Sequence, residues 1–149
     1  MRQCWDRGIA VAEPWRRAFT GKKDERIAEV LRAARRPLSA YDLVEQLRDE
    51  GVNAPTTVYR ALNRLIAAGY VHRLESLNAF VSCARECRHG TAVFAICDAC
   101  GAVTEFADDL VSGRLVMWAD VAKFTLERTT IELRGRCNAC RPGTIAESV

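Results

Sequence analysis

Two Cys-x-x-Cys pairs in the second half of the chain constrain its fold more than any other feature. Cys97 and Cys100 form the first pair, and Cys137 and Cys140 form the second, in a chain with seven cysteines among 149 residues. Thiolates at this spacing can share one tetrahedral zinc ion. A single pair would fit a redox motif equally well, so a zinc-bound thiol enzyme stays open as an alternative. Two pairs in a chain this short favour a structural zinc site.

The length and the composition limit the classes of protein that can carry such a site. A chain of 149 residues allows one ordinary domain or two small ones. Its 49% apolar and 28% charged residues are typical of a globular protein. No window contains the roughly 18 apolar residues that a membrane span needs, and the N-terminus lacks the apolar run of a signal peptide. We therefore expect a cytoplasmic protein without a membrane partner.

Charge is distributed unevenly along the chain. Residues 1–78 contain 14 basic and 10 acidic side chains, a net charge of +4, whereas the remainder contains 8 and 9, a net charge of −1. A basic first half favours an anionic partner, although a solvated helix surface explains the same charge equally well. If each half folds separately, metal binding or dimerisation should supply the stability that a domain of this size lacks.

The first half has the pattern of three helices followed by a hairpin. Apolar residues recur every three or four positions in three segments, Ser39 and Asp42 form a capping pattern, and Pro55 begins the third segment. Two short β-prone segments follow. We predict helices over 24–36, 39–50 and 55–68, and strands over 70–74 and 79–83. This order predicts a winged helix-turn-helix domain.

The third helix carries its polar residues opposite its apolar face. Hydroxyl, guanidinium and amide groups of this kind reach phosphates and base edges when a helix enters the major groove. An ordinary soluble helix surface would have the same composition, but the hairpin behind the helix favours DNA binding because a wing can brace the DNA backbone. The polar residues are Thr56, Thr57, Arg60, Asn63 and Arg64, with Tyr59 on the flank.

The second half predicts a small α+β domain. Its elements are strands over 91–97 and 102–106, a helix capped by Asp108 or Asp109 and running toward Lys123, and a strand over 125–136. Between the halves, residues 84–90 contain few apolar side chains. We therefore assign 1–83 to the winged-helix domain, with 1–21 as an extension, 84–90 to a hinge and 91–149 to the second domain.

Several segments together resemble the ferric uptake regulator family. They are Ser39-Ala-Tyr-Asp-Leu43, Pro55-Thr-Thr-Val-Tyr-Arg-Ala-Leu62 and Cys97-Asp-Ala-Cys-Gly-Ala-Val-Thr-Glu105. Tyr70-Val-His-Arg-Leu-Glu-Ser76, followed by Asn78 and Cys83, is most similar to the zinc uptake regulator branch. The resemblance covers about residues 37–141.

The resemblance implies a fold and a function. The fold is α+β, with an N-terminal winged helix and a C-terminal dimerisation domain held by the tetrathiolate zinc. The function is zinc-responsive repression of zinc uptake genes by a homodimer bound to operator DNA, with no enzymatic step and no small organic substrate. Tyr41 and Arg60 match positions that the family uses near the groove, and Thr57, Tyr59, Asn63 and Arg64 are further candidate contacts.

The zinc branch also implies a second zinc ion per chain, in a sensor site. Its ligands would be His72, Cys83, His89 and Glu105. One thiolate and one carboxylate balance the charge of the ion, and two imidazoles complete a set that suits zinc. Cys87 competes with His89 for the fourth position. Three of the ligands also have ordinary explanations: His72 as a surface or phosphate-contacting residue of a wing strand, Cys83 as a small buried apolar residue and Glu105 as a solvated strand residue.

Two other interpretations stay open. A related sensor of iron, manganese or peroxide could use the same scaffold, although it would need a histidine-rich site or oxidisable thiols. A thiol oxidoreductase or hydrolase is disfavoured because no nucleophile and base pair accompanies the cysteines.

Overall fold

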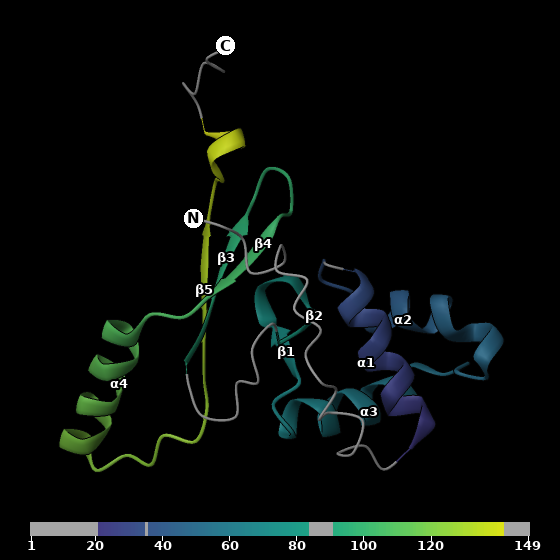
Figure 1. Cartoon of the computed structure of the whole chain (residues 1–149), viewed down its shortest axis with the longest axis horizontal. Coiled ribbons are helices and arrows are strands. Elements are labelled where there is room, and N and C mark those ends of the chain that lie inside the picture. The colour runs from purple at the N-terminus through teal and green to yellow at the C-terminus, as the bar shows by residue number, and fades with distance from the viewer. Residues whose placement is uncertain (1–20, 35, 84–90, 142–149) are drawn as a thin grey trace. The chain divides into compact units, whose positions relative to one another are not determined.

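The structure is a computed structural model that describes residues 21–34, 36–83 and 91–141 (Figure 1). The chain forms two compact units, residues 1–88 and 89–149. The predicted N-terminal extension, apart from Gly21, lies outside the described residues. So does the predicted hinge, which contains Cys87 and His89. The domain limits proposed from the sequence therefore stay a prediction.

The first unit begins with three helices, α1 (Lys22–Ala34), α2 (Ala40–Leu47) and α3 (Pro55–Ala67). A reciprocal capping box starts α2: the Ser39 hydroxyl accepts a hydrogen bond from the amide of Asp42, whose carboxylate accepts one from the amide of Ser39. The α-helix ends three residues earlier than predicted because residues 48–50 tighten into a 3₁₀ turn. Gly51 then reverses the chain at φ 80°.

A hairpin follows α3 and forms the wing. Strand β1 (Val71–Leu74) pairs antiparallel with β2 (Ala79–Ser82). Asn78, in the left-handed region at φ 47°, ends the connecting turn. Leu38, just before α2, exchanges backbone hydrogen bonds of 3.0 and 2.8 Å with Phe80 of the wing. The three helices and the hairpin confirm the predicted winged helix-turn-helix.

A continuous apolar core holds this unit together. Each fully buried leucine or isoleucine contributes about 1.5–3 kcal/mol relative to an exposed one. The helices supply most of the core and β1 and β2 close it. Its largest aliphatic side chains are Ile27, Leu31, Leu38, Leu43, Leu47, Leu62 and Leu65.

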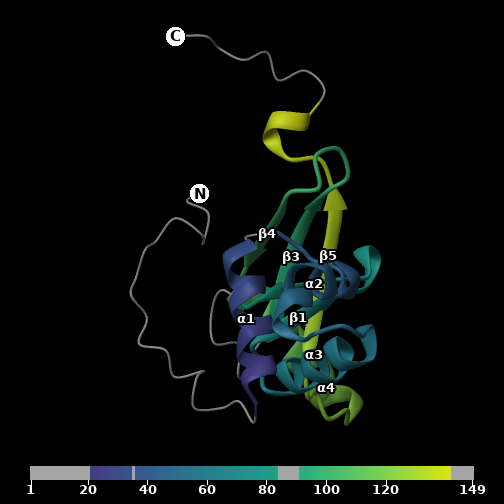
Figure 2. The same ribbon diagram turned by 90° about the vertical axis from the view of Figure 1, so that its right-hand side faces the viewer.

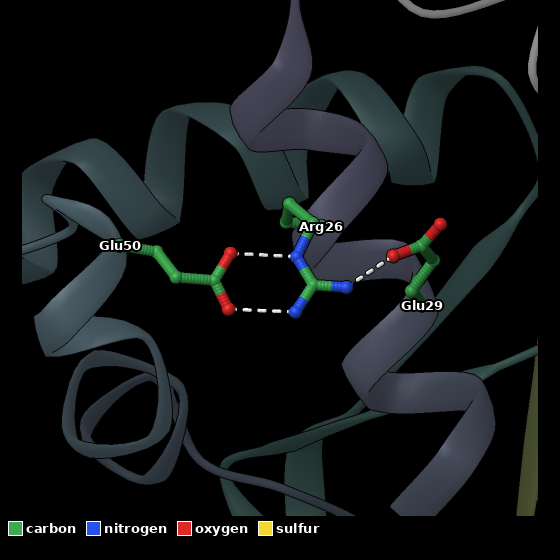
Figure 3. Close-up of polar contacts among 3 residues, drawn as sticks. All are labelled: Arg26, Glu29 and Glu50. Carbon is green, nitrogen blue, oxygen red and sulfur yellow. Dashed lines mark hydrogen bonds and ion pairs between the residues drawn. The ribbon is translucent and has the colours of Figure 1, made fainter.

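An ion-pair cluster at the surface joins α1 to the turn before α3. The Arg26 guanidinium donates to both carboxylate oxygens of Glu50 at 2.6 Å and also pairs with Glu29 (Figure 3). The hydrogen bonds from Arg26 lower the pKa of Glu50. Because these side chains are exposed, solvent screens the pair and its contribution to stability is small.

The second unit is a three-stranded sheet with one helix. Strands β3 (Thr91–Cys97), β4 (Val103–Phe106) and β5 (Thr129–Gly135) lie in the order β4-β3-β5 (Figure 2). Strand β4 is antiparallel to β3, and β5 is parallel to it after a crossover through α4 (Asp109–Ala122). The third strand begins at residue 129 rather than 125 because its ladder starts where Thr129 meets Thr91, the first residue of β3.

Helix α4 lies to one side of the sheet (Figure 1), and most of its residues are exposed. Asp108 caps it by accepting hydrogen bonds from the amides of Leu110 and Val111 at 2.9 and 3.0 Å. Ala119 is its one buried residue. Within residues 21–34, 36–83 and 91–141, the helices are too short or too polar to cross a bilayer.

Candidate metal centre and nucleic-acid interface

The four paired cysteines converge at one end of the second unit's sheet. Cys97 ends β3 and Cys100 lies in the turn that follows, whereas Cys137 and Cys140 come directly after β5. Strands β3 and β5 run parallel and in register to their last residues, Cys97 and Gly135. Parallel strands end at the same edge of a sheet, so the register brings the two cysteine pairs together.

The sulfur positions fit a tetrahedral metal ion. All four sulfur atoms lie within 4.8 Å of one another, and those of Cys100 and Cys137 are 3.8 Å apart. Metal–sulfur bonds of about 2.3 Å give a tetrahedron with sulfur–sulfur edges of about 3.8 Å. The four cysteines are free thiols rather than disulfides. This cluster therefore could hold one zinc ion with four thiolate ligands.

The backbone prepares one of these thiols for ionisation. The amide of Cys137 donates a hydrogen bond of 3.3 Å to the sulfur of Cys97. That contact, helped by the amide of Cys100, lowers the pKa of Cys97 to about 6. Hydrogen bonding with the thiols of Cys137 and Cys100 raises the pKa of Cys140 to about 12. Four adjacent thiols ionise together only when a cation balances their charge.

A salt bridge that the sequence analysis missed fixes the first cysteine turn. The guanidinium of Arg134, on β5, donates two hydrogen bonds of 2.8 and 2.6 Å to one carboxylate oxygen of Asp98. The amide of Asp98 also donates to the carbonyl of Gly135 at 2.8 Å. Only the parallel register of β3 and β5 shows that these residues meet, because they are 36 positions apart.

Two of the predicted sensor ligands lie together on the wing. His72 of β1 pairs with Val81 of β2, and the amide of Cys83 donates to the carbonyl of Tyr70 at 2.9 Å, which extends the ladder. Residues two apart on a strand share a face, so Cys83 is on the face of Val81 and His72. Its sulfur and an imidazole nitrogen of His72 lie within 4.8 Å of each other.

The remaining proposed sensor ligands are in different parts of the chain. Glu105 belongs to β4 of the second unit, where it pairs with Phe94 of β3 and is buried. His89 and its competitor Cys87 lie outside the described residues. The assignment of a sensor site to all four residues stays a prediction.

Helix α3 presents the predicted polar face to solvent. Thr56, Arg60 and Asn63 are exposed, and Tyr41, at the start of α2, is exposed as well. Thr57 and Tyr59 are half-buried, and the ring of Tyr59 packs edge-on against Phe80 of the wing with centroids 6.2 Å apart. Their roles as DNA contacts stay predictions.

Arg64, the sixth predicted contact, has a partner that the sequence did not indicate. Its guanidinium makes two hydrogen bonds, of 2.7 and 2.6 Å, to the carboxylate of Asp24 on α1. These residues are 40 positions apart, and no local pattern relates them.

Comparison with known proteins gives one consistent family. The sequence model that describes the ferric uptake regulator family matches residues 19–134 of this chain. The zinc uptake regulation protein of Escherichia coli (strain K12) is 42% identical over 106 residues, which cover 69% of this chain and 61% of that protein. The chain thus matches less than two thirds of that relative's length.

Two further relatives extend the comparison. The ferric uptake regulation protein of Vibrio parahaemolyticus is 34% identical over 104 residues, covering 68% of each chain. Among solved structures, a zinc uptake regulator complexed with zinc and DNA has a TM-score of 0.75 and 33% identity, and the match covers 85% of this chain and 86% of that one.

Proposed function

Because this chain belongs to the ferric uptake regulator family, we propose that it is a zinc-responsive transcriptional repressor that binds operator DNA as a homodimer. The observation that carries the proposal is that His72 and Cys83 lie on one face of the wing, with their ligand atoms within 4.8 Å of each other. A metal ion bound there would act directly on the unit that contains α3, the helix with the predicted DNA contacts. The greater identity to the zinc uptake regulation protein supports zinc as the signal.

In this proposal α3 enters the major groove and the wing lies along the backbone. The exposed guanidinium of Arg60 would read a base edge, and Thr57, Tyr59, Asn63 and Arg64, with Tyr41 of α2, would contribute further contacts. Arg60→Ala should then weaken the free energy of operator binding by about 1–3 kcal/mol and reduce the preference for one base pair of the operator. Binding measured across a set of single-base operator variants tests this role; an Arg60→Ala protein with normal folding and unchanged specificity would contradict it.

The cluster of Cys97, Cys100, Cys137 and Cys140 would hold a structural zinc ion. Four thiolates fill a tetrahedral site and leave no open position for catalysis or for rapid exchange. The distances between the sulfur atoms support this assignment. The ion would join the turn after β3 to the end of β5 and so stabilise the second unit.

We assign the sensor zinc to His72, Cys83, His89 and Glu105, which gives two ions per chain. The thiolate of Cys83 favours zinc over iron or manganese, which prefer nitrogen and oxygen ligands. To move the protein from about 1:99 to 99:1 in favour of the DNA-binding state, zinc must prefer that state by roughly 5.5 kcal/mol. A site with three or four ligands can supply this preference.

A mobility-shift experiment with zinc or with EDTA, in excess nonspecific DNA, tests regulation by zinc. We expect operator binding only in zinc, and equal binding in both would refute the proposal. Cys83→Ser should remain a folded dimer with its structural zinc but lose the response. The same assay on Cys87→Ser and His89→Ala identifies the fourth ligand, because only a true ligand loses the response while it keeps its fold.

A sensor of iron, manganese or peroxide on the same scaffold is the alternative, and the identity to a ferric uptake regulation protein favours it over an enzyme. Titrations of operator binding with zinc, iron(II) and manganese(II), and with peroxide after iron loading, separate these possibilities. A thiol oxidoreductase would instead reduce a model disulfide. We propose no enzymatic activity and no small organic substrate, and we expect the protein in the cytoplasm.

A further inference from the structure

An ion pair joins α1 to α3, and only its acidic partner is buried. Asp24 is 2% exposed, whereas the side chain of its partner Arg64 is 53% exposed. The pair uses Nε and Nη2 of Arg64, which donate to the two carboxylate oxygens at 2.7 and 2.6 Å. It therefore anchors one edge of the guanidinium in the protein and leaves the two N–H groups of Nη1 outside the pair.

Arg64 lies on α3 next to other side chains that are proposed to contact DNA. It is one helical turn after Arg60, in the last turn of α3, and Asn63 beside it is exposed. Two arginines four positions apart on a helix repel each other. The carboxylate of Asp24 offsets this repulsion and restricts a long side chain that would otherwise lose rotamer freedom on binding a ligand.

We propose that Asp24 is a positioning residue that holds Arg64 with its Nη1 edge, which lies outside the ion pair, toward a DNA phosphate. This inference rests on the proposed DNA-binding function. Planar guanidinium groups with several donors suit contacts to phosphate oxygens, and such contacts fix the register of a protein on DNA. Asp24 itself contacts no DNA and acts only through Arg64.

The proposal predicts an effect opposite in sign to simple electrostatics. Asp24→Asn removes one negative charge, so long-range attraction alone would strengthen binding to DNA. A positioning role predicts about tenfold weaker binding, the size of one charge-assisted hydrogen bond. The slope of log affinity against log salt concentration should also become shallower by about 0.9 per chain, because one phosphate contact is lost.

The matched control is Asp49→Asn. Asp49 is an exposed acid of the same unit, and its substitution makes the same change in charge without touching Arg64. We expect it to bind DNA as tightly as the parent or slightly more tightly. The zinc-loaded full chain would be assayed on two probes, a duplex selected by the parent from a random pool and a mixed-sequence duplex, each of about three helical turns.

A second variant keeps the proposal testable if Asp24→Asn fails to fold. Arg64→Gln can still donate a hydrogen bond to Asp24 but lacks the Nη1 edge, and it should show the same tenfold loss and the same shallower slope. Asp24→Asn combined with Arg64→Gln should bind no more weakly than Arg64→Gln alone, because Asp24 acts through Arg64. Thermal unfolding and zinc content establish that each variant is folded.

Three results would overturn the proposal: Asp24→Asn binding as tightly as Asp49→Asn, Arg64→Gln binding as tightly as the parent, or a further loss in the double variant. A parent whose DNA binding ignores zinc would contradict the proposed function instead. The variants would then be compared on the mixed-sequence duplex, where the same three results decide the role of Asp24.

Discussion

The two units of the chain differ in how completely they bury their apolar surface. In the first unit, helices, wing and the strand-like contact at Leu38 enclose a core whose large side chains are almost inaccessible to solvent. In the second unit, α4 exposes its apolar side chains: Leu110 is 81% exposed, Val121 84% and Trp118 58%. Helices with an exposed apolar surface of this kind are typical of a chain that binds a partner.

This difference indicates that the units are stable for different reasons. We expect packing of its apolar core to supply most of the stability of the first unit. The second has a sheet of three strands, a helix that buries one residue and a cluster of four thiols. We infer that metal binding and association with a second copy of the chain supply what its packing lacks.

Cys97→Ser should have the largest effect, and only on the second unit. The binding free energy of a structural zinc ion is part of the folding free energy, of the order of 10 kcal/mol in small zinc domains. Loss of one thiolate should unfold the second unit at a lower temperature and leave the transition of the first unchanged. Calorimetry measures the unfolding transitions of the two units, and metal analysis measures the zinc content per chain.

Cys83→Ser is the matched control for this variant, because it removes a thiol of the first unit outside the cluster. It should keep the structural zinc and the transition of the second unit. A Cys97→Ser protein with the zinc content of the parent and the second transition of the parent would show that the cluster has no structural role.

Leu62→Ala should affect only the first unit. Leu62 is fully buried in the core, and the cavity left by such a truncation costs about 2–5 kcal/mol. Urea unfolding should show a lower midpoint for the first unit alone. Leu77→Ala, in the exposed turn of the wing, provides the control and should cost less than about 1 kcal/mol. A similar shift in both units would mean that they fold as one cooperative unit.

Trp118→Asp should weaken association of the chains. The ring centroid of Trp118 lies 5.7 Å from that of Phe124, which follows α4, and both side chains are exposed. If a partner covers them, a charge there should cost about 2 kcal/mol, or roughly thirtyfold in the dimer dissociation constant. Sedimentation equilibrium measures it, with Asp120→Ala on the same helix as the control. An unchanged dissociation constant would place the interface elsewhere.

Ser39→Ala should have the smallest effect, about 1 kcal/mol on the first unit, because it removes one half of the capping box. The Ser39 hydroxyl and amide both donate to Asp42 at 2.7 Å and lower the pKa of its carboxyl. A lowered pKa contributes stability above the unfolded value of about 4, and this stability is lost as the pH falls through the folded value.

The pH dependence of unfolding tests this role of the capping box. Ser39→Ala should lose less stability than the parent as the pH falls below about 4, because one of the two hydrogen bonds that lower the pKa of Asp42 is already gone. Ser112→Ala, which removes a hydroxyl from α4 of the second unit, is the control. An identical acid transition of the first unit in Ser39→Ala and the parent would contradict the assignment.

The local signals in the sequence were sufficient for most of the fold. The capping box at Ser39, the proline at the start of α3 and the positions of β3 and α4 follow from interactions among residues a few positions apart. The boundaries that differ depend on longer-range contacts. The third strand of the second unit begins only where β3 offers it a partner.

The sequence by itself determined the type of each element, the polar face of α3 and the four thiols suited to one metal ion, because periodicity, capping and ligand chemistry are local properties. The tertiary structure decided which distant groups meet. The parallel register of β3 and β5 brought the cysteine pairs together, the packing of α1 on α3 paired Asp24 with Arg64, and the position of α4 left its apolar residues exposed. Such contacts arise from packing between segments, which no short window of residues encodes.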